Sequence, residues 1–198
     1  MSEPVRLEPL EDGAVWRILL ATPKANILDM EKTEALSAIF ARAREERQLK
    51  AILIEGAGPN FSFGASVEEH LPPRFEPMIR GFHQLFRLML QAEVTTLAAV
   101  RGQCLGGGLE LAGFCHRLFA APDAKLGQPE IALGVLAPVA SVLLAERIGR
   151  SRAEDLCLSG RSLGAEDGLR IGLVDEIAAD PAERALAYAR EHLLPRSA

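Results

Sequence analysis

Hydrophobic residues recur along the chain in short runs that alternate with longer stretches of helical spacing. The runs at 5–10 and 14–21 flank the turn signal EDG and predict two strands joined as a hairpin. Asp29 precedes a stretch whose apolar residues share one face of a helix, and its side chain is the expected N-cap. The apolar segment AILIEG, residues 51–56, predicts a short buried strand.

The same alternation continues through the rest of the chain. An amphipathic helix is expected over 78–91, a strand over TTLAAV at 95–100, and another strand over 117–120. The remaining expected elements are helices at 139–149, 151–159 and 165–171, a strand at LVDEI and a helix from Pro181. Interleaved strands and helices define the α/β class. Because no repeat or linker divides the sequence, we expect a single domain over residues 1–198.

Composition and charge narrow the range of partners. The chain has 198 residues, is 48% hydrophobic and carries a formal net charge of −5, without a Lys/Arg run, which argues against a nucleic-acid partner. It has neither a signal-like N-terminus nor an apolar run that could span a bilayer, so we expect no membrane partner and a cytoplasmic location. Its scattered cysteines fit a reducing compartment and match no metal-ligand spacing; they are Cys104, Cys115 and Cys157.

The stretch GQCLGGGLELAG, residues 102–113, places consecutive glycines between an apolar strand and an apolar helix. Glycine inside a regular element costs roughly 0.5–1 kcal/mol relative to alanine, so the run requires a steric reason. The first N–H groups of a helix lack partners, and bare glycine backbone lets a ligand reach them. The stretch predicts a donor site for an anion or an oxyanion, with close helix–strand packing as the alternative. Glu110 follows as a candidate acid/base group, or as a carboxylate that only complements the helix dipole.

A second stretch, GPNFSFGASVEEH at 58–70, also follows a buried strand. It too places a glycine and a small residue, Gly64 and Ala65, at an expected helix start. Two such turns can hold one oxygen atom from two sides, as a tetrahedral or enolate oxygen requires. Neither phosphate-loop pattern, G-x-x-x-x-G-K-[ST] or G-x-G-x-x-G, is present in the sequence.

Several motifs resemble the crotonase superfamily, the enoyl-CoA hydratase/isomerase family, over nearly the whole chain. They are PKANILD, NFSFGAS, VRGQCLGGGLELAGFC, LGQPEIALGV and LSGRSLGAEDGLRIGLVDEI, in that order. The resemblance implies a spiral of β-β-α units, a coenzyme A thioester as substrate, no separate cofactor, and a homotrimer or a dimer of trimers. The sequence ends at LLPRSA, where family members typically continue into helices that cover the site. We therefore expect a shortened C-terminal helical part with exposed apolar surface.

The resemblance also implies roles for particular residues. The backbone N–H groups of Ala65 and Gly107 are the expected oxyanion-hole donors, and Glu110 and Glu130 are the expected pair of acid/base carboxylates. Since family members that lack one of the pair often catalyse other reactions, the presence of both indicates a hydratase. Further substrate contacts are expected from Lys24, Phe61, Phe63, Gly64, Ser66, Gly106, Ala137 and Pro138. Lys24 is a candidate contact for a CoA phosphate, and Phe61 or Phe63 is a candidate ring contact.

Two positions depart from the family pattern. Ser66 stands where the family commonly has Asp, and Pro138 lies near a position where glycine often offers an N–H to the catalytic water. Proline has no N–H, so the water is held differently or the alignment slips by one residue. Around these positions, NFSFGASVEEHLP and GVLAPVAS resemble the cyclohexa-1,5-diene-1-carbonyl-CoA hydratases of anaerobic benzoyl-CoA degradation. A neutral Ser66 and an apolar Leu136–Pro138 wall suit a flat ring.

Three alternatives stay open. One is a straight-chain enoyl-CoA hydratase or isomerase, and another is a non-catalytic protein that binds CoA thioesters or acts as a scaffold. The third is a serine hydrolase on a related spiral fold, which requires a serine paired with a histidine. No such pairing is evident in the sequence, so solvated or core roles are expected for His70, His83, His116 and His192.

Overall fold

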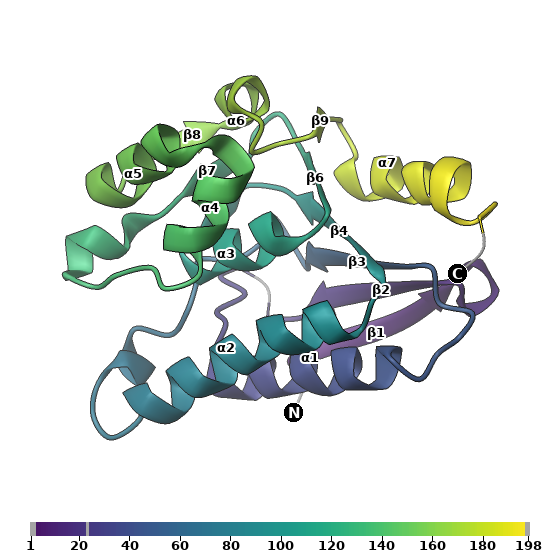
Figure 1. Cartoon of the computed structure of the whole chain (residues 1–198), viewed down its shortest axis with the longest axis horizontal. Helices are drawn as coiled ribbons and strands as arrows, with labels where there is room; N and C mark the ends of the chain where they lie inside the picture. Colours follow the sequence, from purple (N-terminus) through teal and green to yellow (C-terminus); the bar gives the residue numbers. More distant parts are fainter. Residues whose placement is uncertain (1–2, 23, 197–198) are drawn as a thin grey trace.

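A computed structural model describes residues 3–22 and 24–196. Its strands are β1 (Val5–Leu10), β2 (Val15–Leu20), β3 (Ala51–Gly56), β4 (Thr95–Val100), β5 (Gln103–Leu105), β6 (Arg117–Ala120), β7 (Lys125–Gly127), β8 (Ser162–Gly164) and β9 (Glu176–Ile177). Its helices are α1 (Met30–Ala43), α2 (Phe75–Gln91), α3 (Gly107–Phe114), α4 (Ala140–Ile148), α5 (Arg150–Ser159), α6 (Ala165–Ile171) and α7 (Pro181–Tyr188). Figure 1 shows their arrangement.

The larger sheet has the strand order β1-β2-β3-β4-β6-β9. β1 and β2 form the expected antiparallel hairpin, and the pairs from β2 to β9 are parallel. The carboxyl ends of β3 and β4 therefore lie at the same edge of the sheet. The two glycine-containing stretches follow these two strands, so the topology brings them together.

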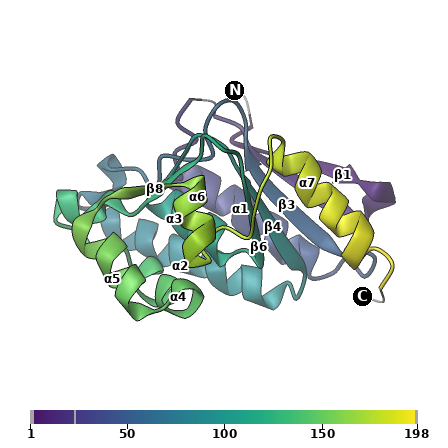
Figure 2. The same cartoon turned by 90° about the horizontal axis from the view of Figure 1, so that it is seen from above.

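Both faces of this sheet are covered, which explains why its central strands are apolar throughout. Ile52 and Ile54 pack into a core shared with α1, α2 and α3, whereas Ala51 and Leu53 pack into a second core with α7. In Figure 1, α1 and α2 run side by side along one face of the sheet, and α7 lies on the other. Figure 2 shows α7 crossing the strands at the opposite end of the molecule from α4 and α5.

A smaller sheet, with the order β5-β7-β8, is not anticipated by the sequence pattern. Each of its strands has only three residues, too few for a periodic signal. The stretch KLGQPEIALGVLAP begins as β7 and continues as a 3₁₀ turn over Pro129–Leu133. This turn places Glu130 on a defined element.

Most expected helices are present, with two differences. Asp29 caps α1 by accepting from the N–H of Lys32 at 2.9 Å, as expected. The predicted helix start at GASVEEH is wrong, because the chain forms only a 3₁₀ turn over Glu68–His70 there. Pro72 and Pro73 follow, and the residue before a proline is biased away from helical backbone. α2 begins at Phe75, earlier than expected.

Within residues 3–22 and 24–196, no helix combines the length and the apolar character needed to cross a membrane. The described residues also contain no group of three His, Cys, Asp or Glu side chains arranged to hold a metal ion. Cys104 and Cys115 are buried free thiols, and Cys157 is half-buried. Burial raises the pKa of Cys115 to about 12, so this thiol stays protonated at neutral pH.

Candidate active site

The two glycine-containing turns are joined by backbone hydrogen bonds. The N–H of Ser62 donates to the carbonyl of Gln103 at 3.0 Å, and the N–H of Leu105 donates to the carbonyl of Ser62 at 2.9 Å. A residue pair, Ser62 and Cys104, forms an isolated parallel bridge between them. The backbone around Ala65 is thereby fixed against the start of α3.

The segment before α1, which carries the PKANILD motif, holds the first turn. Asn26 donates from Nδ2 to the carbonyls of Ala57 and Asn60, at 3.1 and 2.9 Å. The Ser62 hydroxyl donates to the Asn26 carbonyl at 2.8 Å and accepts from the N–H of Gly64 at 3.0 Å. Asn26 of this motif is therefore structural, and it shapes the turn that presents Ala65.

Close approach explains the glycines of the second turn. Gly106 has a φ of 53°, and a Cβ there would lie 2.7 Å from Oε1 of Glu130. A Cβ at Gly107 would lie 3.3 Å from the backbone nitrogen of Ala65. A side chain at either position would enter the space between the two turns and Glu130.

The N–H groups of Ala65 and Gly107 are left without an acceptor. In the part of the chain that the structure describes, neither donates a hydrogen bond to a backbone or side-chain oxygen. Gly107 is the first residue of α3, where the helix dipole favours negative charge. The geometry thus provides two neighbouring backbone donors that can share one oxygen atom.

A cavity of about 310 Å³ opens directly in front of these donors. Its walls come from the first turn, α2, the start of α3 and the segment 129–138. Most of the lining is apolar; among the described residues its polar side chains are His70, Glu110 and Glu130. An apolar cavity with a few convergent polar groups is typical of a small-molecule site.

Glu110 is almost completely buried, with 2% of its surface exposed. Its Oε1 accepts from the N–H groups of Val139 and Ala140, at 2.8 and 2.7 Å. Burial raises the pKa of Glu110 to about 7, and the charge of Glu130 adds to this, while the two backbone donors oppose it. A carboxyl group with this pKa exchanges a proton readily near neutral pH.

Glu130 reaches the cavity from the 3₁₀ turn after β7. The buried amide of Gln128, oriented so that both ends are satisfied, donates to Oε1 and Oε2 of Glu130 at 3.0 and 2.8 Å. Burial raises the pKa of Glu130, while a hydrogen bond from its own backbone N–H and a positive charge on His70 oppose the rise. The structure therefore brings together two carboxyl groups that are distant in the sequence, both with raised pKa values.

His70 is a cavity residue that the sequence did not single out. Its Nδ1 lies 2.7 Å from the carbonyl oxygen of Ser66, and its ring lines the cavity. Apolar lining residues were missed as well: Val67, Leu71, Met78, Ile79, Leu133 and Val135. Their positions depend on how α2 and the 129–138 segment fold over the turns, which no local pattern encodes.

The other expected contacts divide into two groups. Phe63, Gly64, Gly106 and Pro138 line the cavity, together with Leu136. Phe61 and Ala137 are instead buried in the core. The carbonyl of Ser66 contacts His70, and the carbonyl of Lys24 accepts from Asn60 Nδ2 at 2.8 Å. Of the two phenylalanines, the cavity therefore contacts Phe63.

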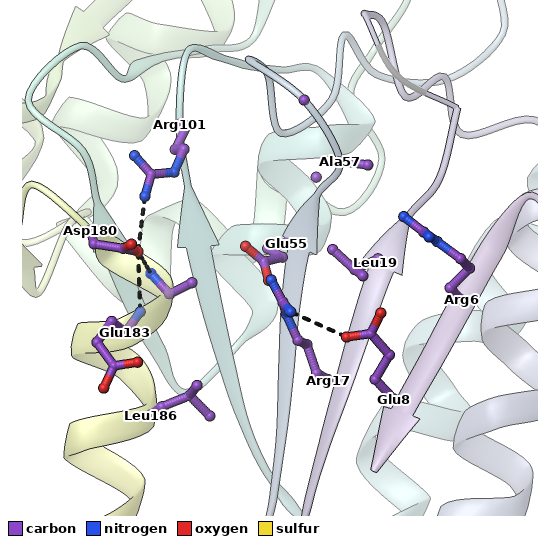
Figure 3. A pocket seen from close by; sticks show the side chains of 13 residues that line it. Arg6, Glu8, Arg17, Leu19, Glu55, Ala57, Arg101, Asp180, Glu183 and Leu186 are labelled. Atoms are coloured by element: carbon purple, nitrogen blue, oxygen red, sulfur yellow. Dashed lines mark hydrogen bonds and ion pairs between the residues drawn. The ribbon is translucent and has the colours of Figure 1, made fainter. Parts of the chain in front are cut away.

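A larger cleft, of about 580 Å³, lies on the opposite face of the sheet, between the strands and α7 (Figure 3). Several of its charged side chains form ion pairs with one another. Arg17 pairs with Glu8 and Glu55, and Arg101 pairs with Asp180. Despite its size, this cleft contains neither the unpartnered backbone donors nor the carboxyl groups with raised pKa values, so we place the active site in the smaller cavity.

Comparison with known proteins identifies the family of this chain. The enoyl-CoA hydratase/isomerase family profile matches residues 11–194. The chain belongs to the enoyl-CoA hydratase/isomerase family, which confirms the resemblance seen in the sequence and the expectation of a hydratase-type enzyme.

Individual relatives refine the comparison. The chain is 49% identical over 197 residues to a cyclohexa-1,5-dienecarbonyl-CoA hydratase of Thauera aromatica, covering 100% of this chain and 76% of the relative. It is 36% identical to a probable enoyl-CoA hydratase of Mycobacterium bovis, covering 90% of this chain and 70% of the relative. The crystal structure of a Geobacillus kaustophilus enoyl-CoA hydratase superposes with a TM-score of 0.89 at 29% identity, covering 96% and 75% of the two chains, which confirms the fold class.

Proposed function

We propose that this protein adds water to an α,β-unsaturated acyl-CoA thioester, and that its substrate is cyclohexa-1,5-diene-1-carbonyl-CoA in anaerobic aromatic degradation. The observation that carries the proposal is one apolar cavity bordered by two unpartnered backbone donors and two carboxyl groups with raised pKa values. The 49% identity to a hydratase named for this substrate supports the choice of acyl group.

The polarity of the substrate decides where water adds. Attack at the ring carbon β to the thioester carbonyl moves the electrons onto the thioester oxygen, giving a dienolate. Attack at the far alkene carbon would leave the charge where the thioester cannot accept it. The N–H groups of Ala65 and Gly107 hold the dienolate oxygen, and each such donor contributes roughly 2.7–4 kcal/mol in comparable oxyanion holes.

The two carboxyl groups handle the protons. Glu110 takes one proton from water as the oxygen bonds to the β-carbon, and Glu130 delivers a proton to the γ-carbon of the dienolate. The product is a 6-hydroxycyclohex-1-ene-1-carbonyl thioester, and the net change is the addition of one H and one OH. Proton transfer from Glu110 back to Glu130 restores the starting state.

The remaining parts of the proposal concern the setting of this reaction. Coenzyme A is part of the substrate, and no separate cofactor is needed for a hydration. We propose a cytoplasmic protein that assembles as a homotrimer or a dimer of trimers. Phe63 and Leu136, both exposed at the cavity, are the proposed contacts for the ring.

The test compares kcat/KM for cyclohexa-1,5-diene-1-carbonyl-CoA and crotonyl-CoA, following the loss of conjugated thioester absorbance. We expect a clear preference for the cyclic substrate. Preference for crotonyl-CoA would indicate a straight-chain hydratase and overturn the ring-specific proposal. Tight thioester binding without turnover of either compound would indicate a non-catalytic binding protein.

A further inference from the structure

His70 is the polar cavity residue to which the proposed hydration assigns no role. It ends the 3₁₀ turn Glu68–His70, directly after the turn that presents Ala65. It lines the same cavity as Glu110 and Glu130.

The contact with Ser66 defines the state of the imidazole ring. A carbonyl oxygen only accepts hydrogen bonds, so the nitrogen 2.7 Å from it, Nδ1, must carry a hydrogen. In the neutral ring the other nitrogen, Nε2, is then unprotonated and is a hydrogen-bond acceptor. The Ser66 carbonyl thus fixes both the tautomer and the orientation of the ring.

The adding water needs two acceptors, because it has two protons. Glu110 takes the proton that leaves, and the second proton stays on the oxygen and becomes the product hydroxyl. Glu130 is the proton donor to carbon in the proposed reaction, and both of its oxygens already accept from the Gln128 amide. Among the described lining residues, His70 is the remaining polar side chain that can accept from this second O–H.

The backbone N–H groups near Pro138 do not hold the water from its oxygen side either. Pro138 has no N–H. The next two N–H groups, of Val139 and Ala140, both donate to Oε1 of Glu110. The donors of this segment therefore hold the base rather than the water.

We propose that His70 is a positioning residue whose Nε2 accepts a hydrogen bond from the reacting water and then from the product hydroxyl. This inference rests on the proposed hydratase function. His70 exchanges no proton in this role, so the proton balance of the reaction is unchanged. It orients one lone pair of the water oxygen toward the β-carbon while Glu110 removes the other hydrogen.

Two amide substitutions separate this role from a structural one. In His70→Asn the side-chain NH₂ can still donate to the Ser66 carbonyl, but the acceptor at the Nε2 position is lost. In His70→Gln the amide can place an oxygen near the Nε2 position, while the contact with Ser66 is lost. His83→Asn, on α2 and outside the cavity lining, is the matched control.

We expect His70→Asn to lower kcat at least about tenfold, the loss of one hydrogen bond in the transition state, with little change in KM or in the unfolding midpoint. His70→Gln should recover most of the rate. Wild-type kcat in His70→Asn, or equal losses in both variants, would overturn the inference. A purely structural role predicts the reverse order, with His70→Gln the more damaged in stability and rate. A wild-type protein that hydrates neither thioester would instead overturn the proposed function and this inference with it.

Discussion

Replacing Glu110 by glutamine should change how stability depends on pH. The stability of the variant relative to wild type should be higher at alkaline pH than at acidic pH. Glu110 is buried at the start of α3, and burial raises its pKa from the usual 4.5 to about 7. A group whose pKa is higher in the folded than in the unfolded protein stabilises the fold below the unfolded value. That stabilisation is lost as the pH rises through the folded value. Glutamine cannot ionise, so the variant escapes this loss.

The expected size follows from the two pKa values. The difference between about 7 and 4.5, at about 1.4 kcal/mol per pH unit, corresponds to a loss of about 3.5 kcal/mol in the unfolding free energy of the wild type. Most of it falls between pH 5 and pH 8. The glutamine carbonyl can still accept from the N–H groups of Val139 and Ala140, so the pH-independent cost of the substitution is small.

Urea unfolding at several pH values from 5 to 8 measures this difference. The free-energy gap between Glu110→Gln and wild type should move in favour of the variant by about 2–3 kcal/mol across that range. Glu34→Gln, at an exposed position on α1, is the control for removal of a carboxylate. If the gap stays constant within about 0.5 kcal/mol, the pKa of Glu110 is not raised, and its assignment as a base tuned to neutral pH fails.

Three further outcomes test the site. Glu110→Gln and Glu130→Gln should each lower kcat about 10²–10⁴-fold while KM for the thioester changes little; a wild-type rate in either would exclude that residue as the acid/base group. Gly106→Ala should lower activity and melting temperature, because its Cβ would lie 2.7 Å from Glu130 Oε1 and the backbone has a φ of 53° there. Gly81→Ala on α2, where a Cβ meets open space, should change neither. Phe61→Ala should cost about 3–5 kcal/mol of unfolding free energy, whereas Phe63→Ala should mainly raise KM; similar stability losses in both would contradict their placement in core and cavity.

The elements that could be predicted are those whose residues carry their own signal. The hairpin of β1 and β2, the capped helix α1 and the buried strands β3 and β4 follow from local periodicity and turn residues. The smaller sheet could not be predicted, because its three-residue strands exist only through pairing between distant segments. The secondary-structure propensity of a short segment cannot predict which distant strand it pairs with.

The candidate site divides in the same way. Gly106 and Gly107 stand out in the sequence, since a run of glycines needs an explanation. His70 does not stand out, because its importance comes from a backbone carbonyl at Ser66 and from a cavity completed by the distant segment 129–138. A histidine near a turn is ordinarily solvated, and only the folded arrangement distinguishes this one.

Pro138 shows how a departure from the family pattern is accommodated. In the sequence it removes an N–H that could hold the water, which raises the question of what replaces it. In the structure the chain after Pro138 enters α4, and the N–H groups of Val139 and Ala140, which have no partner within the helix, donate to Glu110. They oppose the effect of burial on the Glu110 pKa, which therefore reaches about 7 and no higher. The segment thus tunes the base instead of donating to the water, and the contact proposed for His70 is of the opposite kind, an acceptor for a water proton.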